Sequence, residues 1–78
     1  PEITRAERNT MDIKRTLRQE LLATAEHYRQ HAAWERKRAE QATNGSMVQA
    51  EIMQAAKYNE GRAAAMLEAV ELLDRYIG

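Results

Sequence analysis

Two histidines and a glutamate follow one another at single-turn spacing in the first half of the chain. His27, His31 and Glu35 are four residues apart, and on a helix this spacing places three potential metal ligands on one face. The second half of the chain offers no clear fourth ligand. The His-Glu-x-x-His order of zinc proteases is also absent, because residues 27–31 read His-Tyr-Arg-Gln-His. We therefore expect no metal site and no cofactor.

Groups suited to catalysis are scarce in this sequence. The chain has no cysteine, a single serine and no glycine-rich phosphate loop. The serine, Ser46, stands where a helix cap is expected. Glu68 and Glu71 form a carboxylate pair, but they fall on a predicted solvent face, which gives no environment for paired acid–base work. We expect a protein without catalytic residues, and not an enzyme.

A polar and aromatic middle layer is the most distinctive pattern. The central parts of both predicted helices lack leucine, isoleucine and valine, so alanine, tyrosine and polar groups must fill the space between them. One interpretation is a small-ligand site, because bundle interiors bind ligands through a few polar groups set in apolar walls. The other is a hydrogen-bonded layer that fixes helix register, as a buried asparagine does in coiled coils. The residues concerned are Tyr28, His31, Tyr58 and Asn59.

Arginines recur along the first helix at multiples of seven residues. Such a basic face is a candidate for binding a nucleic-acid phosphate backbone. Most of these arginines have acidic neighbours three or four residues away, however, and a self-neutralised solvent face is the simpler interpretation. A formal net charge of zero also differs from the basic excess usual in nucleic-acid-binding domains. The candidate residues, including one nearby arginine, are Arg8, Arg15, Arg18, Arg29 and Arg36.

The elements that would position these residues are two helices. Ala, Glu, Arg, Gln, Leu and Met dominate the sequence, and all favour helix. Thr43-Asn44-Gly45-Ser46 interrupts the pattern: Gly45 suits the left-handed position that ends a helix, and Ser46 with Gln49 forms a capping box. We predict one domain over residues 1–78, with helices at about 4–43 or 10–43 and at about 46–76, joined by a turn at 44–45. The earlier start is indicated by Thr4 with Glu7.

Both predicted helices carry one apolar stripe. In the second helix the stripe alternates steps of four and three residues, as in a coiled coil; its members are Ile52, Ala56, Asn59, Ala63, Met66, Val70, Leu73 and Ile77. The stripe of the first helix contains Ala6, Ile13, Leu17, Leu21, Ala25, Tyr28, Ala32, Ala39 and Ala42. A short connection between such helices predicts an all-α antiparallel hairpin, with its strongest core at the open end, where the leucines lie.

The composition predicts that this hairpin associates with a further partner. Of the 34 hydrophobic residues 14 are alanine, and phenylalanine is absent, so a lone hairpin has little apolar area to offset chain entropy. Residues 65–77 are apolar at nine of thirteen positions, which is wider than one neighbouring helix covers. We therefore expect a homodimer that forms a four-helix bundle. The predicted interface residues are Trp34, which lies off the main stripe, and Met66, Leu67, Val70, Leu72, Leu73 and Tyr76.

The function that follows is protein–protein interaction. We expect a small self-associating protein that acts as an adaptor, assembly factor or inhibitor, of a kind common in viruses and mobile elements. Nucleic-acid binding and small-ligand sequestration are the alternatives. A cysteine-free chain suits the reducing cytoplasm, no signal-peptide pattern opens it, and no apolar run approaches the roughly 20 residues of a membrane span.

Overall fold

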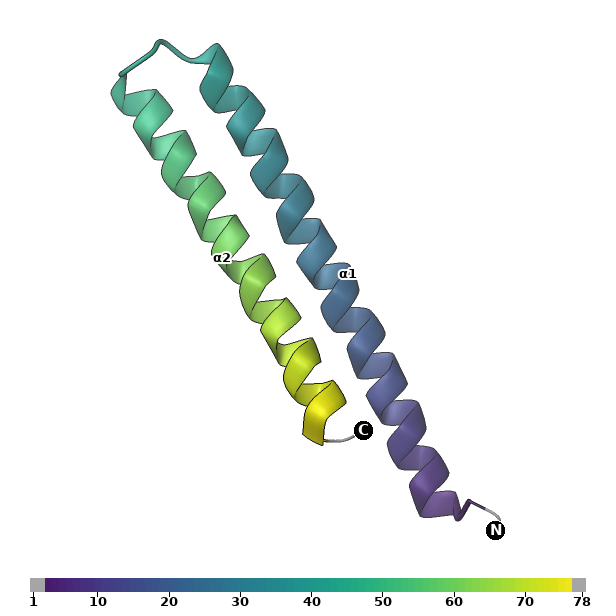
Figure 1. The fold of residues 1–78 in the computed structure, drawn as a ribbon. Helices are drawn as coiled ribbons and strands as arrows, with labels where there is room; N and C mark the ends of the chain where they lie inside the picture. Colours follow the sequence, from purple (N-terminus) through teal and green to yellow (C-terminus); the bar gives the residue numbers. More distant parts are fainter. Residues whose placement is uncertain (1–2, 77–78) are drawn as a thin grey trace.

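The structure, a computed structural model, describes residues 3–76 as two long helices lying antiparallel (Figure 1). The first, α1, spans Arg5–Gln41, and the second, α2, spans Met47–Tyr76. Residues 42–46 connect them, and the described residues contain no strand. The all-α antiparallel hairpin expected from the sequence is thereby confirmed. The end of the predicted stripe at Ile77 lies outside the described residues.

Hydrogen bonds at the helix ends explain where the helices begin. The backbone N–H of Glu7 donates to the Thr4 hydroxyl at 3.1 Å, so α1 takes the earlier of the two starts that the sequence allowed. At the turn, the N–H of Gln49 donates to the Ser46 hydroxyl at 3.1 Å. Gly45 has φ +78°, a conformation that costs glycine little because it has no Cβ. The sequence therefore marked both helix starts and the region of the turn. The predicted end of the first helix at residue 43 is wrong: α1 ends at Gln41 with Ala42 as an extended cap, and Gly45 lies within the turn instead of ending the helix.

The contact between the helices is built mainly from alanine. Of the buried hydrophobic residues only three are larger than alanine, and no large side chain among the described residues is fully buried. Small side chains let two helices approach closely, but they remove little apolar surface from water. The buried hydrophobic residues are Ala25, Ala32, Ala39, Ile52, Ala56, Ala63, Val70 and Leu73.

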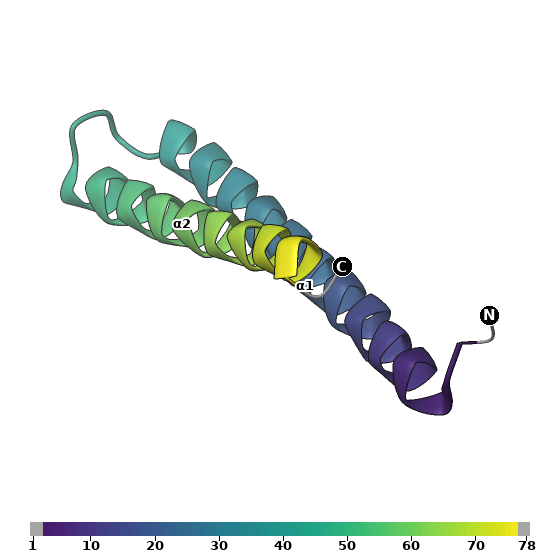
Figure 2. The same cartoon turned by 60° about the horizontal axis from the view of Figure 1, so that its bottom comes forward.

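The two helices differ in length, and this changes where the apolar residues lie. α1 has 37 residues and α2 has 30, and both views show α1 continuing past the end of α2 (Figures 1 and 2). The N-terminal end of the predicted α1 stripe therefore has no helix opposite it, and Ala6 and Ile13 are exposed. Leu17 is exposed as well, although the neighbouring Arg18 contacts α2. The expected strong core at the open end is only partly formed, because Leu17 and Leu67 are 46 % and 39 % exposed while Val70 and Leu73 are buried.

The resulting shape is a thin rod. The hairpin measures 64 × 16 × 12 Å and exposes 6324 Å². A compact monomer of its mass, 9.0 kDa, exposes about 4,850 Å² by the usual scaling of surface with mass. The hairpin thus leaves about 1,500 Å² more surface in water than a globular chain of equal mass would.

Candidate functional site

Charged side chains of the two helices form ion pairs along one side of the hairpin. Nε of Arg18 donates to both carboxylate oxygens of Asp74 at 3.2 Å, and Lys14 Nζ lies 3.8 Å from the same carboxylate. Arg36 forms a second pair with Glu60. These side chains are partly exposed, so each pair contributes about 0–1 kcal/mol. The pairs fix the antiparallel register of the helices more than they add to the free energy of unfolding.

The arginines considered for nucleic-acid binding are mostly occupied within the fold. Besides the two interhelical pairs, Arg15 Nη2 contacts Asp12 Oδ1 at 2.8 Å, and Arg29 Nη1 lies 3.9 Å from Glu26 Oε2. Arg8 is exposed on the N-terminal part of α1. The structure therefore presents a basic set whose charges are largely compensated, as the acidic neighbours in the sequence indicated.

The histidine–glutamate series does not come together as a metal centre. His31 Nε2 lies 3.4 Å from Glu35 Oε1, and the rings of His27 and His31 stack with centroids 6.5 Å apart. No group of three potential ligand residues within residues 3–76 is placed to hold a metal ion. Instead Glu35 is 7 % exposed and contacts Arg38 Nη1 at 3.4 Å. A buried acidic residue in the helix contact was not expected. The available signal was the position of Glu35 three residues after Ala32, which places both on the same side of the helix.

Two of the four predicted ligand-layer residues are joined by Arg62, which a hairpin folded about Gly45 places opposite Tyr28 but which was not among the predicted site residues. The Arg62 guanidinium lies 5.0 Å from the Tyr28 ring centroid and 5.3 Å from that of Tyr58, and it donates a hydrogen bond to the Tyr58 hydroxyl. That bond, together with the charge interaction with both tyrosines, raises the pKa of Arg62. Its position four residues after Tyr58 is the signal that could have identified it.

The predicted ligand layer is more exposed to solvent than an enclosed ligand site would be. Tyr58 and His31 are exposed, while Tyr28 and Asn59 are half-buried. The tyrosines and the arginine therefore form a surface stack on the outside of the hairpin. Its geometry favours holding the two helices in register, by cation–π contacts worth roughly 0.5–1 kcal/mol each at exposed sites.

Trp34 lies on the outer surface of α1, toward the turn. It is 52 % exposed and borders a shallow hollow of about 270 Å³, which Gln30, Ala33 and Lys37 also line. The Arg38 guanidinium stands 4.8 Å from its ring centroid. A half-exposed tryptophan stacked by arginine is the combination enriched at protein-binding hot spots. We call these residues, together with Arg38, the Trp34 surface.

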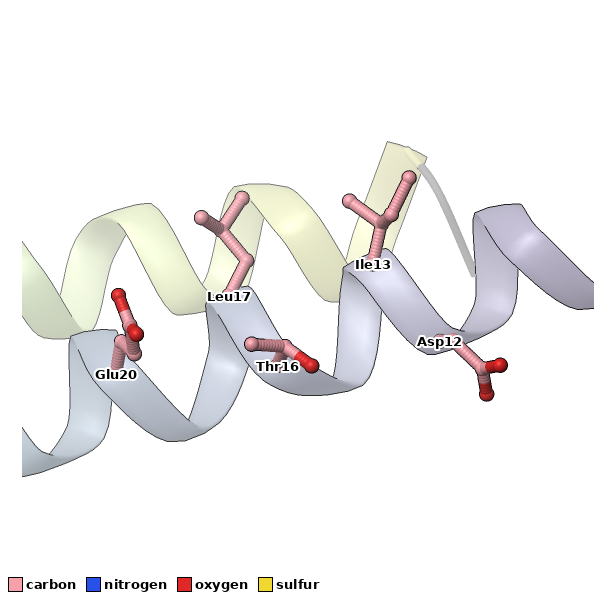
Figure 3. A pocket seen from close by; sticks show the side chains of 5 residues that line it. All are labelled: Asp12, Ile13, Thr16, Leu17 and Glu20. Carbon is pink, nitrogen blue, oxygen red and sulfur yellow. The ribbon is translucent and has the colours of Figure 1, made fainter.

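A second exposed apolar area lies at the open end of the hairpin. Ile13 and Leu17 stand one turn apart on α1 and line a groove of about 290 Å³ with Asp12, Thr16 and Glu20. Figure 3 shows both aliphatic side chains projecting on the side where α2 ends, with Asp12 pointing the other way. The fractional exposures are 65 % for Ile13, 46 % for Leu17, 50 % for Leu72 and 75 % for Tyr76. We call these four residues the open-end patch.

Helical geometry places the open-end patch on one face of the hairpin. Leu72 and Tyr76 are each two residues from Asp74, and at about 100° per residue this puts them on the far side of α2 from the Arg18–Asp74 pair. Ile13 is five residues from Arg18, so it also points well away from that pair. The ion pairs therefore occupy one face and the patch the other.

The remaining residues of the predicted interface are placed differently from one another. Leu67 is exposed, and Met66 is half-buried between the helices. Val70 and Leu73 are buried in the hairpin's own contact, so they have little surface left for a partner. Conversely, Ile13 and Leu17 were assigned to the core by their phase, and the structure adds them to the exposed apolar surface. The inequality of the two helix lengths was the available signal.

Comparisons with protein families, with curated proteins and with solved structures gave no match for this chain. Within residues 3–76 neither helix contains an apolar stretch of the length that a bilayer crossing requires. The description of function therefore depends on the two exposed surfaces just described.

Proposed function

We propose that this chain is a non-enzymatic interaction protein that self-associates, with a homodimer as its working unit. The observation that carries the proposal is the distribution of apolar residues. The contact between the helices consists mostly of alanine, while leucine, isoleucine, tryptophan and tyrosine side chains stand in solvent. Clusters of exposed large apolar side chains on soluble proteins often mark binding surfaces, and two such clusters lie on this hairpin.

The energetics of a lone hairpin support the same conclusion. Two helices of 37 and 30 residues must be ordered at about 1.5 kcal/mol per residue. Burial of alanine offsets little of that cost, because a methyl group removes far less apolar area than a leucine side chain. A second copy that covers the exposed aliphatic groups supplies the missing burial and produces the dimeric four-helix bundle.

The homodimer leaves a role for a further protein partner. The Trp34 surface combines an aromatic ring, an adjacent guanidinium and a lysine, and such a surface suits docking against another protein rather than chemistry. An adaptor, assembly or inhibitor role in the cytoplasm, in a viral or mobile-element setting, is consistent with a chain of this design. The nucleic-acid alternative is weaker, because the ion pairs compensate most of the candidate arginines.

Sedimentation equilibrium over about three decades of protein concentration tests self-association, with thermal unfolding followed at the same concentrations. We expect a dimer at micromolar concentration and a melting temperature that rises with concentration, as mass action requires for a folded dimer. A stable, fully helical monomer across the whole range would overturn the proposal. Retardation of DNA or RNA at low salt, lost steeply as salt rises, would instead favour the nucleic-acid alternative.

A further inference from the structure

The N-terminal part of α1 extends beyond the end of α2. Asp74, in the last turn of α2, is paired with Arg18 and Lys14. In the described residues no hydrogen bond or ion pair joins the helices on the N-terminal side of Lys14. The preceding residues of α1, from Arg5 to Ile13, therefore form an overhang of about 14 Å at 1.5 Å per residue. Both views of the hairpin show this extension (Figures 1 and 2).

The end of α2 is acidic, whereas the overhang is balanced. Residues 68–76 contain three acidic side chains and one basic, and residues 5–13 contain two basic side chains, Arg5 and Arg8, and two acidic ones. Lys14 and Arg15 are already paired with Asp74 and Asp12, so the charges left for a contact with another copy are those of Arg5 and Arg8. A second copy that lies antiparallel can bring its own overhang alongside the acidic end of α2, and the reverse contact forms by symmetry.

The open-end patch lies at the centre of this contact. Ile13 and Leu17 border the beginning of the overhang, and Leu72 and Tyr76 belong to the acidic end of α2. All four are on the face that carries no interhelical ion pair, so apolar contact there breaks none of the hairpin's own links. The surface in excess of a compact monomer, about 1,500 Å² per chain, is larger than the roughly 800 Å² per partner of a standard interface.

We propose that two copies of this chain associate through their open ends, antiparallel and partly overlapping. Each overhang packs against the last turns of the other copy's α2, and the two open-end patches meet around the two-fold axis. In the overlap each overhang lies beside both helices of the other copy, while the turns and the Trp34 surfaces remain free at the outer ends. This arrangement rests on the proposed self-association and assigns it a location.

The open-end dimer differs measurably in length from a bundle paired along its whole length. An overlap of about 20 residues corresponds to about 30 Å, so two rods of 64 Å give a particle of about 100 Å. Two hairpins packed side by side stay near 64 Å. Small-angle X-ray scattering of the unmodified protein, at a concentration where sedimentation finds a dimer, separates the two by maximum dimension.

A pair of matched variants locates the contact. We expect the double variant Ile13→Glu/Leu17→Glu to raise the dimer dissociation constant about 100-fold, since it removes two apolar side chains from the interface. Val48→Glu is the control: Val48 is an exposed aliphatic residue at the opposite end, and we expect a change of less than about three-fold. Both variants change only exposed positions, which limits their effect on the helix contact itself.

The outcomes separate this arrangement from the broader proposal. A particle near 100 Å that loses its dimer with the Ile13/Leu17 variant supports the open-end contact. A dimer near 64 Å, or one that Val48→Glu weakens and Ile13→Glu/Leu17→Glu does not, overturns it and leaves self-association standing. A monomer at every concentration overturns both. If the double variant unfolds instead of forming a helical monomer, the scattering length of the unmodified protein still decides.

Discussion

Arg18 and Asp74, 56 residues apart in the chain, meet through two hydrogen bonds of 3.2 Å near the point where α2 ends. The pair lies at the border between the section of α1 that has a neighbouring helix and the section that has none. It therefore fixes how far α1 extends past its partner, and so the length of the overhang. Because the pair is partly exposed, it acts on register more than on stability.

A double-mutant cycle with Arg18→Ala and Asp74→Ala measures this contact. We expect a coupling energy of about 0.2–1 kcal/mol from urea unfolding at one fixed protein concentration, because both groups remain hydrated. The cycle of Arg15→Ala and Asp12→Ala, a pair within α1, is the control, with about 0.2–0.5 kcal/mol. Both couplings are expected to shrink in 1 M salt, where the Debye length is about 3 Å. A coupling above about 2 kcal/mol would contradict an exposed pair.

The two described glycines predict opposite responses to alanine. Gly45 has φ +78°, so Gly45→Ala places a Cβ in the left-handed region and is expected to lower the free energy of unfolding by about 1–2 kcal/mol. Gly61 lies inside α2, and an added Cβ there meets nothing within 4 Å. Gly61→Ala is therefore expected to raise the free energy of unfolding by about 0.5–1 kcal/mol. Chemical denaturation compares them, and changes of equal sign would be inconsistent with this turn.

The alanine contact predicts a penalty for larger residues. Ala56 is 0 % exposed, and the register places it near Ala32, so a leucine at position 56 must push the helices apart. We expect Ala56→Leu to lower the free energy of unfolding by about 1–3 kcal/mol. Ala64→Leu, at an exposed position of the same helix, should stay within about 0.5 kcal/mol. If Ala56→Leu proved neutral, the helices could not be as closely packed as described.

Much of this fold was predictable because local signals decide it. Thr4, Gly45 and Ser46 each act through one or two hydrogen bonds or a single backbone angle, and such effects are readable from short stretches of sequence. The stripe of α2 was also predicted correctly, since its four-and-three spacing leaves one face for a partner helix. Periodicity thus identified which side of each helix is apolar.

The same periodicity does not indicate how much of α1 lies beside α2. Ile13 and Leu17 lead to the buried Ala25 in steps of four residues, but each such step turns the helix by about 40°, so Leu17 lies about 80° and Ile13 about 120° around the helix from Ala25. In addition, α2 ends too early to cover Ile13. The antiparallel register places Arg62 opposite Tyr28, but its role was not predicted, because a stack between two tyrosines depends on side-chain placement from both helices. Glu35 was seen as a potential metal ligand, whereas its phase, between Ala32 and Ala39, places it in the helix contact.

Replacement of Glu35 by an apolar residue tests that placement. Glu35 is 7 % exposed, and its contacts with Arg38 and His31 are both 3.4 Å long, which compensates a buried charge only weakly. We expect Glu35→Met to raise the free energy of unfolding by about 1 kcal/mol, since burying a methionine in the contact outweighs a weakly compensated buried carboxylate. Urea unfolding at fixed protein concentration provides the measurement.

Two further variants make the Glu35 prediction specific. Arg38→Gln is expected to lower the free energy of unfolding by about 1 kcal/mol, because it leaves the buried carboxylate with His31 as its remaining side-chain partner. Glu40→Met changes an exposed glutamate of the same helix and should stay within about 0.5 kcal/mol. If Glu35→Met raises the free energy of unfolding and Arg38→Gln lowers it, burial of the Glu35 carboxylate destabilises the hairpin and Arg38 offsets part of that cost. Destabilisation by both would mean that the ion pair is a net contributor to the helix contact.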